Sequence, residues 1–87
     1  MYALRFSTAA LKALRTAPPD VVGRIRAKLD ELARDPFTAS NVKELTSHPN
    51  HPGYRLRVGD WQVLYLIQRE EIVIQVVNIR PRKEVCR

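Results

Sequence analysis

The stretch from Tyr54 to Tyr65 constrains the fold most strongly, because two runs of alternating apolar and polar residues meet at Gly59-Asp60. Glycine accepts the positive φ that the first central residue of a type II′ turn requires, so this stretch predicts a tight β-hairpin. A two-residue turn also determines which residues face each other. The expected pairs are Val58 with Trp61, Arg57 with Gln62, Leu56 with Val63, Arg55 with Leu64, and Tyr54 with Tyr65.

The predicted hairpin has one apolar and one polar face, because side chains alternate along a strand with a period of two. Arg55, Arg57 and Gln62 share the polar face. Two neighbouring arginines on a sheet repel each other unless an anion lies close, so the pair is a candidate anion-binding site. The alternative is that carboxylates of nearby turns neutralise the pair: Asp60, Glu70 or Glu71. The apolar face is expected to carry Tyr54, Leu56, Val58, Trp61, Val63, Tyr65 and Ile67.

Charge and length narrow the class of protein. The 87 residues fit one domain, residues 1–87, and the 15 basic and 9 acidic side chains give a net charge of +6. Such a surplus suits nucleic acid, an acidic protein or a membrane surface as partner, with a solvated basic surface as the alternative. The single cysteine, Cys86, excludes an intrachain disulfide and fits a reducing cytoplasm. Neither a signal peptide nor an apolar run of about 20 residues is apparent, so we expect a cytoplasmic protein without a membrane partner.

Hydrophobic periodicity and turn residues predict the remaining elements. A first strand is expected over Tyr2–Phe6, a helix capped by Ser7 or Thr8 that runs to about Arg15, a second helix over Asp20–Arg34, and a long loop over Phe37–Gly53. The hairpin follows, then a turn at Arg69–Glu71 and a strand over Ile72–Ile79. With an even offset at that turn, Ile72, Ile74, Val76 and Asn78 join the Trp61 face, and Gln75, Val77 and Ile79 join the Arg57 face. Arg80–Lys83 then leaves the sheet, and Glu84–Arg87 is a candidate short edge segment.

This order of elements predicts an α+β domain of β-α-α-β-β-β order. Its antiparallel sheet has about four strands, and the two N-terminal helices pack on one face. The helices should cover the Trp61 face and leave the face of the two arginines open. Lys43, Arg80, Arg82 and Lys83 are then expected to extend that open face into a surface that binds phosphate groups.

Other residues that carry chemistry form weaker patterns. His48 and His51 are three apart, but no third ligand is apparent, so the sequence predicts no metal site and no cofactor. Either histidine is a candidate for proton transfer, since histidine titrates near neutral pH. Cys86 has no recognisable partner base that would make it a nucleophile.

The stretch His51–Tyr65, together with Arg82–Val85, resembles the RelE/ParE superfamily of toxins from type II toxin–antitoxin systems, and its RelE-like branch in particular. The resemblance covers essentially the whole chain and implies a RelE-like fold. It implies a metal-independent endoribonuclease that enters the ribosomal A site and cleaves mRNA, where the RNA 2′-hydroxyl attacks the adjacent phosphate. It also implies a cognate antitoxin partner that joins the toxin in a hetero-oligomer.

Matched by position, the resemblance assigns catalytic roles to Arg55, Arg57 and Arg82. Lys43, Arg80 and Lys83 of the predicted phosphate-binding surface, together with Gln62, are then expected to contact RNA. Two positions depart from the family pattern: Gln62 stands where arginine is common, and Cys86 where a tyrosine is common. These departures predict reduced nuclease activity. The alternatives are a ParE-like gyrase inhibitor without nuclease activity, or a weakened toxin retained for antitoxin binding.

Overall fold

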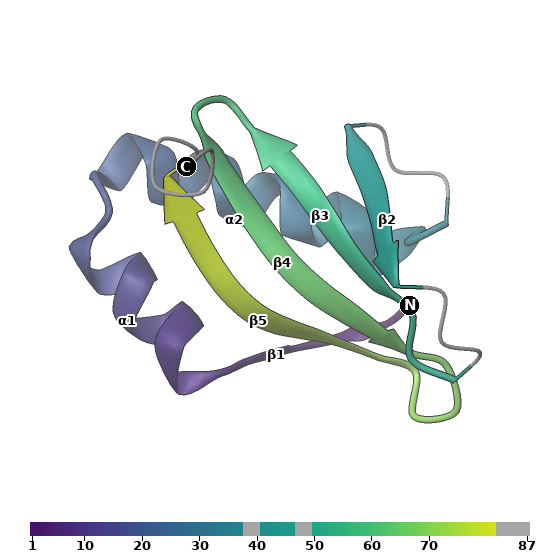
Figure 1. Cartoon of the computed structure of the whole chain (residues 1–87). Coiled ribbons are helices and arrows are strands. Elements are labelled where there is room, and N and C mark those ends of the chain that lie inside the picture. The colour runs from purple at the N-terminus through teal and green to yellow at the C-terminus, as the bar shows by residue number, and fades with distance from the viewer. Residues whose placement is uncertain (38–40, 47–49, 82–87) are drawn as a thin grey trace.

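The computed structural model describes residues 1–37, 41–46 and 50–81, which form a five-stranded sheet and two helices (Figure 1). The elements in chain order are β1 (Ala3–Phe6), α1 (Thr8–Thr16), α2 (Pro19–Arg34), β2 (Val42–Thr46), β3 (Gly53–Val58), β4 (Trp61–Gln68) and β5 (Val73–Pro81). In Figure 1, α2 passes behind the sheet and α1 lies beside β5. Buried residues of both helices pack against one sheet face, so that face is covered and the other, called the open face below, is not.

The α+β architecture with both helices on one face agrees with the prediction, but the sheet differs from it in two ways. It has five strands in the order β1-β5-β4-β3-β2, and β1 pairs with β5 in the parallel sense. Short turns reverse the chain from β3 to β4 and from β4 to β5, so these strands pair in the antiparallel sense, as β2 and β3 also do. No such turn connects β1 to its partner. Both helices and three strands separate β1 from β5 in the sequence. The turn residues therefore do not predict whether β1 pairs in the parallel or the antiparallel sense.

The predicted hairpin is confirmed in full. All five expected residue pairs between β3 and β4 are present, and Gly53 and Leu66 extend the ladder by one more pair. Gly59 has a φ of +57°, while Asp60 is not among the described residues with positive φ. A positive φ at the first central residue alone is the signature of the type II′ turn.

The long loop predicted over Phe37–Gly53 is wrong, because β2 lies within it and pairs antiparallel with β3. β2 is an edge strand, and four of its five residues are exposed. An edge strand with little buried surface needs no apolar alternation, so the sequence pattern that reveals inner strands is missing. The Thr46 hydroxyl anchors the end of β2 by accepting a hydrogen bond from the Gly53 backbone N–H at 2.9 Å.

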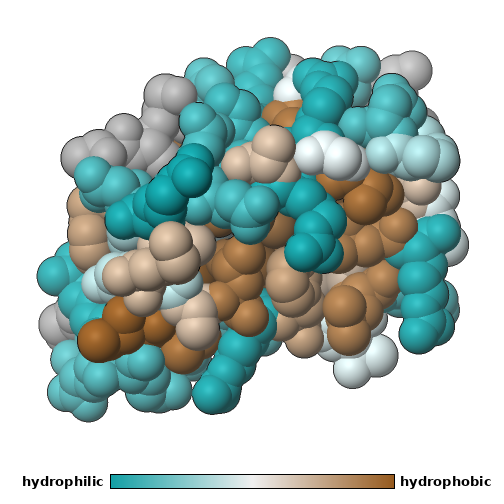
Figure 2. Space-filling view, turned by 180° about the vertical axis from the view of Figure 1, so that it is seen from behind, coloured by the Kyte–Doolittle hydropathy of each residue, from teal (hydrophilic) through white to brown (hydrophobic). Residues whose placement is uncertain are grey.

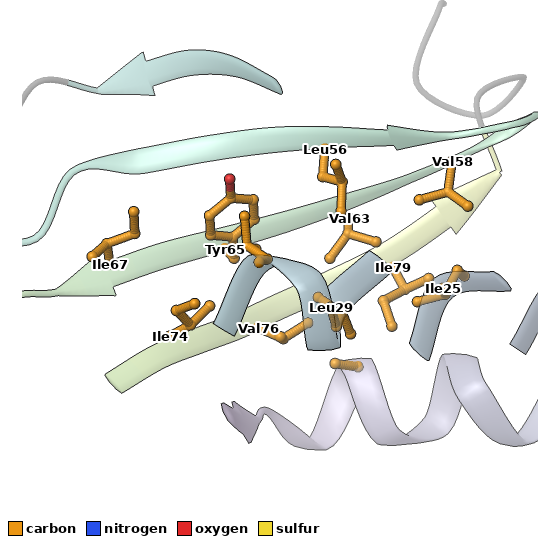
Figure 3. Packing of buried hydrophobic residues seen from close by; sticks show 12 residues of the cluster. Ile25, Leu29, Leu56, Val58, Val63, Tyr65, Ile67, Ile74, Val76 and Ile79 are labelled. Atoms are coloured by element: carbon orange, nitrogen blue, oxygen red, sulfur yellow. The ribbon is translucent and has the colours of Figure 1, made fainter. Parts of the chain in front are cut away.

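The core lies between the helices and the covered sheet face (Figure 3). Burying side chains of this size stabilises the fold by about 1.5–3 kcal/mol each, relative to leaving them exposed. From the rear, apolar side chains gather across the middle of the helix side, and hydrophilic ones lie over much of the rest (Figure 2). None of the helices in the described ranges is long and apolar enough to span a membrane. The largest fully buried side chains are Tyr65, Ile25, Leu29, Leu32, Leu56, Ile67, Ile74, Val63 and Val76.

β5 departs from the predicted alternation at a β-bulge. Leu64 pairs with Asn78 but Tyr65 pairs with Val76, so Val77 is an extra residue without a partner on β4. The sheet faces predicted for Ile74, Gln75 and Val76 are therefore confirmed, whereas those predicted beyond the bulge are wrong. Ile79 lies opposite Val63 and is 3% exposed, in the core, whereas Asn78 lies on the open face. Ile72 also differs from the prediction, since it lies in the turn with a φ of +55° and is 52% exposed.

Ser7 joins the first helix to this bulge. Its hydroxyl caps α1 by accepting a hydrogen bond from the Ala10 N–H at 3.0 Å, and it donates to the carbonyl of Val77. The Ser7 backbone N–H donates to the Val76 carbonyl at 2.9 Å. One residue thus satisfies a free N–H of the helix and a carbonyl of the irregular strand, which lacks a regular ladder partner.

Replacement of the cap tests this arrangement. We expect Ser7→Ala to lower the free energy of unfolding by about 1–2 kcal/mol in urea titrations, because it removes the helix cap and the hydrogen bond to the bulge. Thr8→Ala is the matched control, since Thr8 is the exposed first residue of the helix, and we expect a change below about 0.5 kcal/mol. Equal losses in the two variants would contradict the assignment of Ser7 as the cap.

The Tyr65 side chain supports a second stability prediction. Its ring stacks on Tyr54 with a centroid separation of 5.6 Å, and its buried hydroxyl has no hydrogen-bond partner among the described residues. Tyr65→Phe removes an unsatisfied polar group and keeps the ring, so we expect unfolding free energy unchanged or raised by up to about 1 kcal/mol. Tyr65→Ala should cost about 3–5 kcal/mol as a cavity control. A loss above 1 kcal/mol for Tyr65→Phe would reveal a bond to the hydroxyl.

Candidate nucleic-acid interface

The open face carries two rows of side chains that cross neighbouring strands. Residues paired directly across a sheet share a face, so the register places each row without reference to side-chain conformation. The first row, called the arginine row, runs over three strands and comprises Arg57, Gln62 and Arg80. The second, called the middle row, runs over four strands and comprises Lys43, Arg55, Leu64 and Asn78.

The bulge at Val77 places Arg80 in the arginine row. With strict alternation through β5, residue 80 would share the covered face with Ile74 and Val76. The extra residue reverses the faces of all later positions, so that Arg80 lies opposite Gln62. Neighbouring strands are about 4.8 Å apart, so the Cα atoms of Arg57 and Arg80 are separated by about 10 Å. Two arginine side chains can span that distance and meet at one phosphate group.

The positive charges of the two rows are not neutralised by the carboxylates that the sequence suggested. Within residues 1–37, 41–46 and 50–81, the ion pair that forms joins Lys28 to Glu31 at 3.5 Å on the surface of α2. Neither Arg55 nor Arg57 has such a partner in that part of the chain. Lys43, Arg57 and Arg80 are exposed and Arg55 is half-buried, so most of these cations face solvent.

Gln62 occupies the centre of the arginine row and is 5% exposed. The pairing of Gln62 with Arg57 agrees with the predicted hairpin. The Gln62 side chain is buried, however, so its amide is not freely accessible at the surface. The expected contact between Gln62 and RNA therefore stays a prediction. An amide at this point separates two like charges, whereas an arginine would add a third.

Several predicted site residues lie outside the described residues: Arg82, Lys83, Cys86 and His48. The candidate edge segment Glu84–Arg87 lies there too. His51 is exposed, at the start of the segment that leads into β3. In the part of the chain that the structure describes, no group of three histidine, cysteine or acidic residues lies close enough to hold a metal ion.

Tyr65 is unsuited to proton transfer at neutral pH. Burial of its hydroxyl, together with the neighbouring Tyr54, raises the pKa of Tyr65 above its usual range. The phenol therefore stays protonated, and its position in the core keeps it away from the open face. Its stacked partner Tyr54 is half-buried on the same covered side.

A second basic region, which sequence reasoning missed, lies at the edge of β3 next to α2. A cleft of about 330 Å³ is lined there by Arg24 and Lys28 of the helix and by Arg57 of the arginine row. The rest of its lining is formed by Ala27, Asn41, Val58 and Gly59. Helical spacing alone predicts only that Arg24 and Lys28 face away from the apolar side of α2. Only the packing of α2 against the end of β3 brings them beside Arg57.

Gly59 leaves room for the Arg24 side chain of α2 to lie against the hairpin turn. A Cβ at this position would lie 2.6 Å from Nη2 of Arg24, and the φ of +57° is unfavourable for any residue with a side chain. By contrast, a Cβ at Gly23, inside α2, would meet nothing within 4 Å. The two glycines therefore have opposite effects on stability. Gly59 is required by the backbone conformation of the turn, whereas Gly23 destabilises the helix in which it lies.

Alanine substitutions at the two glycines should shift stability in opposite directions. We expect Gly59→Ala to lower the unfolding free energy by about 1–2 kcal/mol, because of the left-handed backbone and the displacement of Arg24. Gly23→Ala should raise it by about 0.5–1 kcal/mol, because alanine favours the helix. Thermal and urea unfolding measure both. A neutral Gly59→Ala would contradict the turn geometry.

Comparison with known proteins identifies the family. The family model described as the ParE toxin of the type II toxin–antitoxin system parDE matches residues 4–86, nearly the whole chain. The chain belongs to this toxin family. A search of curated proteins found no match. The chain is thus a member of the RelE/ParE superfamily of toxins, as its sequence predicts.

Solved structures of RelE toxins share the fold. The archaeal RelE–RelB complex from Pyrococcus horikoshii is 26% identical, with a TM-score of 0.86 over 93% of this chain and 94% of that one. The intact Escherichia coli RelBE complex is also 26% identical, with a TM-score of 0.74 over 93% and 96%. The Mycobacterium tuberculosis RelBE2 complex is 24% identical, with a TM-score of 0.75 over 93% and 98%, and this likeness concerns the fold alone.

Proposed function

We propose that this toxin inhibits translation by cleaving mRNA on the ribosome, without a metal ion, through attack of the RNA 2′-hydroxyl on the adjacent phosphate. The single observation that carries the proposal is the alignment of Arg57 and Arg80 in one row of the open face, with Arg55 in the next. The likeness to RelE structures at 26% identity supports it.

The reaction explains why arginines are needed there. Attack by the 2′-oxygen forms a pentacoordinate phosphorus that carries more negative charge on its oxygens than the starting diester. The bond to the 5′-oxygen then breaks, which leaves a cyclic phosphate on one fragment and a 5′-hydroxyl on the other. Guanidinium groups fixed in advance around that phosphorus stabilise the developing charge, which is usually the largest single contribution to catalysis.

The arginines act by charge and by orientation, not as bases. A guanidinium stays protonated at any physiological pH, and its planar fork donates two hydrogen bonds to a pair of phosphate oxygens. We assign Arg55 and Arg57 to this role on β3, and we assign the same role to Arg82, which lies outside the described residues. Arg80 is assigned, as an RNA contact, to the same phosphate as Arg57. Lys43 and Lys83 are assigned to the flanking phosphates, whose contacts position the RNA.

The same proposal includes a partner and a location. The P. horikoshii and E. coli structures are complexes of RelE with its antitoxin RelB, and we infer that this toxin likewise forms a hetero-oligomer with a cognate antitoxin. A toxin that acts on translating ribosomes works in the cytoplasm, without membrane association.

Loss of one arginine should remove most of the activity. We expect Arg57→Ala to reduce mRNA cleavage at least a hundredfold, because it removes a preformed contact to the transition-state charge. Primer extension on mRNA from cells induced for the toxin measures the cuts. Arg26→Ala is the matched control: it removes an equal charge from an exposed position on α2, and we expect it to leave cleavage unchanged.

Two results would contradict the proposal at different levels. If the unaltered toxin produces no codon-linked cuts while protein synthesis continues normally, ribosome-dependent cleavage is wrong. If Arg57→Ala remains as toxic as the unaltered protein, the reaction stands but the assigned site is wrong.

The matching family model, which describes ParE toxins, favours a second candidate function: a ParE-like gyrase inhibitor without nuclease activity. The same fold then serves as a binding module, and the arginine row has no catalytic role. A supercoiling assay with purified gyrase separates the two candidates. Inhibition of supercoiling, with ribosome-bound mRNA left intact, would support the ParE-like function.

A further inference from the structure

The cleft beside β3 is a second place where cations of this protein converge. Arg24 and Lys28 reach it from α2, and Arg57 reaches it from the sheet. These residues contribute three formal positive charges, and no acidic residue is among the described residues that line the cleft. Its volume of about 330 Å³ is enough to admit a phosphate group together with bridging water.

We propose that this cleft binds a backbone phosphate of single-stranded RNA, on the same strand that crosses the open face. The inference deepens the proposed function, on which it rests for the identity of the RNA. It assigns the role of RNA contact to Arg24 and Lys28, which lie on a helix behind the sheet.

The guanidinium of Arg24 lies at the rim of the cleft, over the Cα of Gly59. A methyl group on that Cα would come within 2.6 Å of Nη2. The lack of a side chain at Gly59 therefore leaves room for the guanidinium beside the turn, and the planar fork of a guanidinium matches two phosphate oxygens.

Lys28 differs from Arg24 because it already has a neighbouring carboxylate. Its ammonium lies 3.5 Å from Glu31, and both side chains are substantially exposed. Exposed pairs of this kind contribute little to stability, so a phosphate can compete for the ammonium. Lys28 therefore adds attraction to the cleft, and Arg24 adds a planar fork that can bind two phosphate oxygens.

The edge of the sheet provides the connection between the cleft and the open face. β2 begins at Val42, and just before it the Asn41 carbonyl accepts a hydrogen bond from the Arg57 N–H at 2.9 Å. The described part of β2 therefore does not extend alongside Val58 and Gly59. Arg57 belongs both to the arginine row and to the cleft lining, so a chain of phosphates can follow these cations around the edge.

RNA fits this arrangement better than an acidic protein segment does. An RNA strand carries one negative charge per nucleotide, so successive phosphates can occupy the open face and the cleft together. An acidic side chain of a protein partner would satisfy the cleft alone and would not require Arg57 to be shared between the two sites. That alternative predicts a different outcome in the experiment below.

Salt-dependent binding to RNA tests the proposal. The probe is a short fluorescent single-stranded RNA with 2′-O-methyl groups, which cannot be cleaved by 2′-hydroxyl attack, and fluorescence anisotropy measures its affinity across salt concentrations. Each phosphate contact to a single strand contributes about 0.7 to the slope of log K against log salt. We expect Arg24→Gln to reduce the slope by about 0.7 relative to the unaltered toxin. Arg26→Gln, an equal loss of charge on the same helix, should leave it nearly unchanged.

Lys28→Gln serves as a second cleft variant, because Arg24 also packs on the hairpin turn and its loss can lower stability. Thermal unfolding of each variant shows that the protein measured is folded. We expect Lys28→Gln to reduce the slope as well, and by no more than Arg24→Gln does.

Three results would overturn the inference: equal slopes for Arg24→Gln and Arg26→Gln, an absence of RNA binding by the unaltered toxin, or cleft variants that weaken antitoxin binding but not RNA binding. The last would assign the cleft to a protein carboxylate.

The proposed function has a separate readout. If ribosome-dependent cleavage fails but Arg24→Gln still lowers the slope, the cleft stands and the enzymatic proposal falls. If cleavage succeeds and the slopes are equal, only the cleft is wrong.

Discussion

The hydrogen bond from Ser7 to the Val77 carbonyl holds the irregularity on which the open face depends. A bulge is costly when its backbone groups lack partners, and here the cap residue of α1 supplies one of them. The bulge in turn places Ile79 in the core and Arg80 on the opposite face. The packing of the first helix and the placement of a cation of the arginine row therefore meet at the same bulge.

The open face combines several like charges without described carboxylates to neutralise them. Such an arrangement destabilises the isolated protein slightly, and its repulsion is screened at physiological salt because the Debye length is about 8 Å. An anionic ligand reverses the sign of the interaction. The buried Gln62 at the centre of the arginine row keeps the two arginines apart without adding charge, which is a smaller electrostatic cost than a third arginine would impose.

Local rules were sufficient to predict the hairpin, both helices and the outward direction of Arg55 and Arg57. Gly59-Asp60 determines the turn, and the turn determines the register, so a period of two assigns every side chain on β3 and β4. The same rule failed on β5, because nothing in the composition of Val76-Val77 distinguishes a bulge from a regular strand. β2 was missed because an exposed edge strand has no apolar alternation. The cleft was missed because it depends on the distance between α2 and the end of β3, a tertiary property.

The central claim is that the bulge brings Arg80 into one functional unit with Arg57 across the buried Gln62. A double-mutant cycle in single-turnover cleavage of mRNA on purified, programmed ribosomes tests it most directly. We expect Arg57→Ala and Arg80→Ala each to slow cleavage, and the double variant to lose clearly less than the product of the two single effects, because residues that act on one transition state are coupled. Strictly multiplicative losses, or an Arg80→Ala variant that cleaves at the unaltered rate, would contradict the claim.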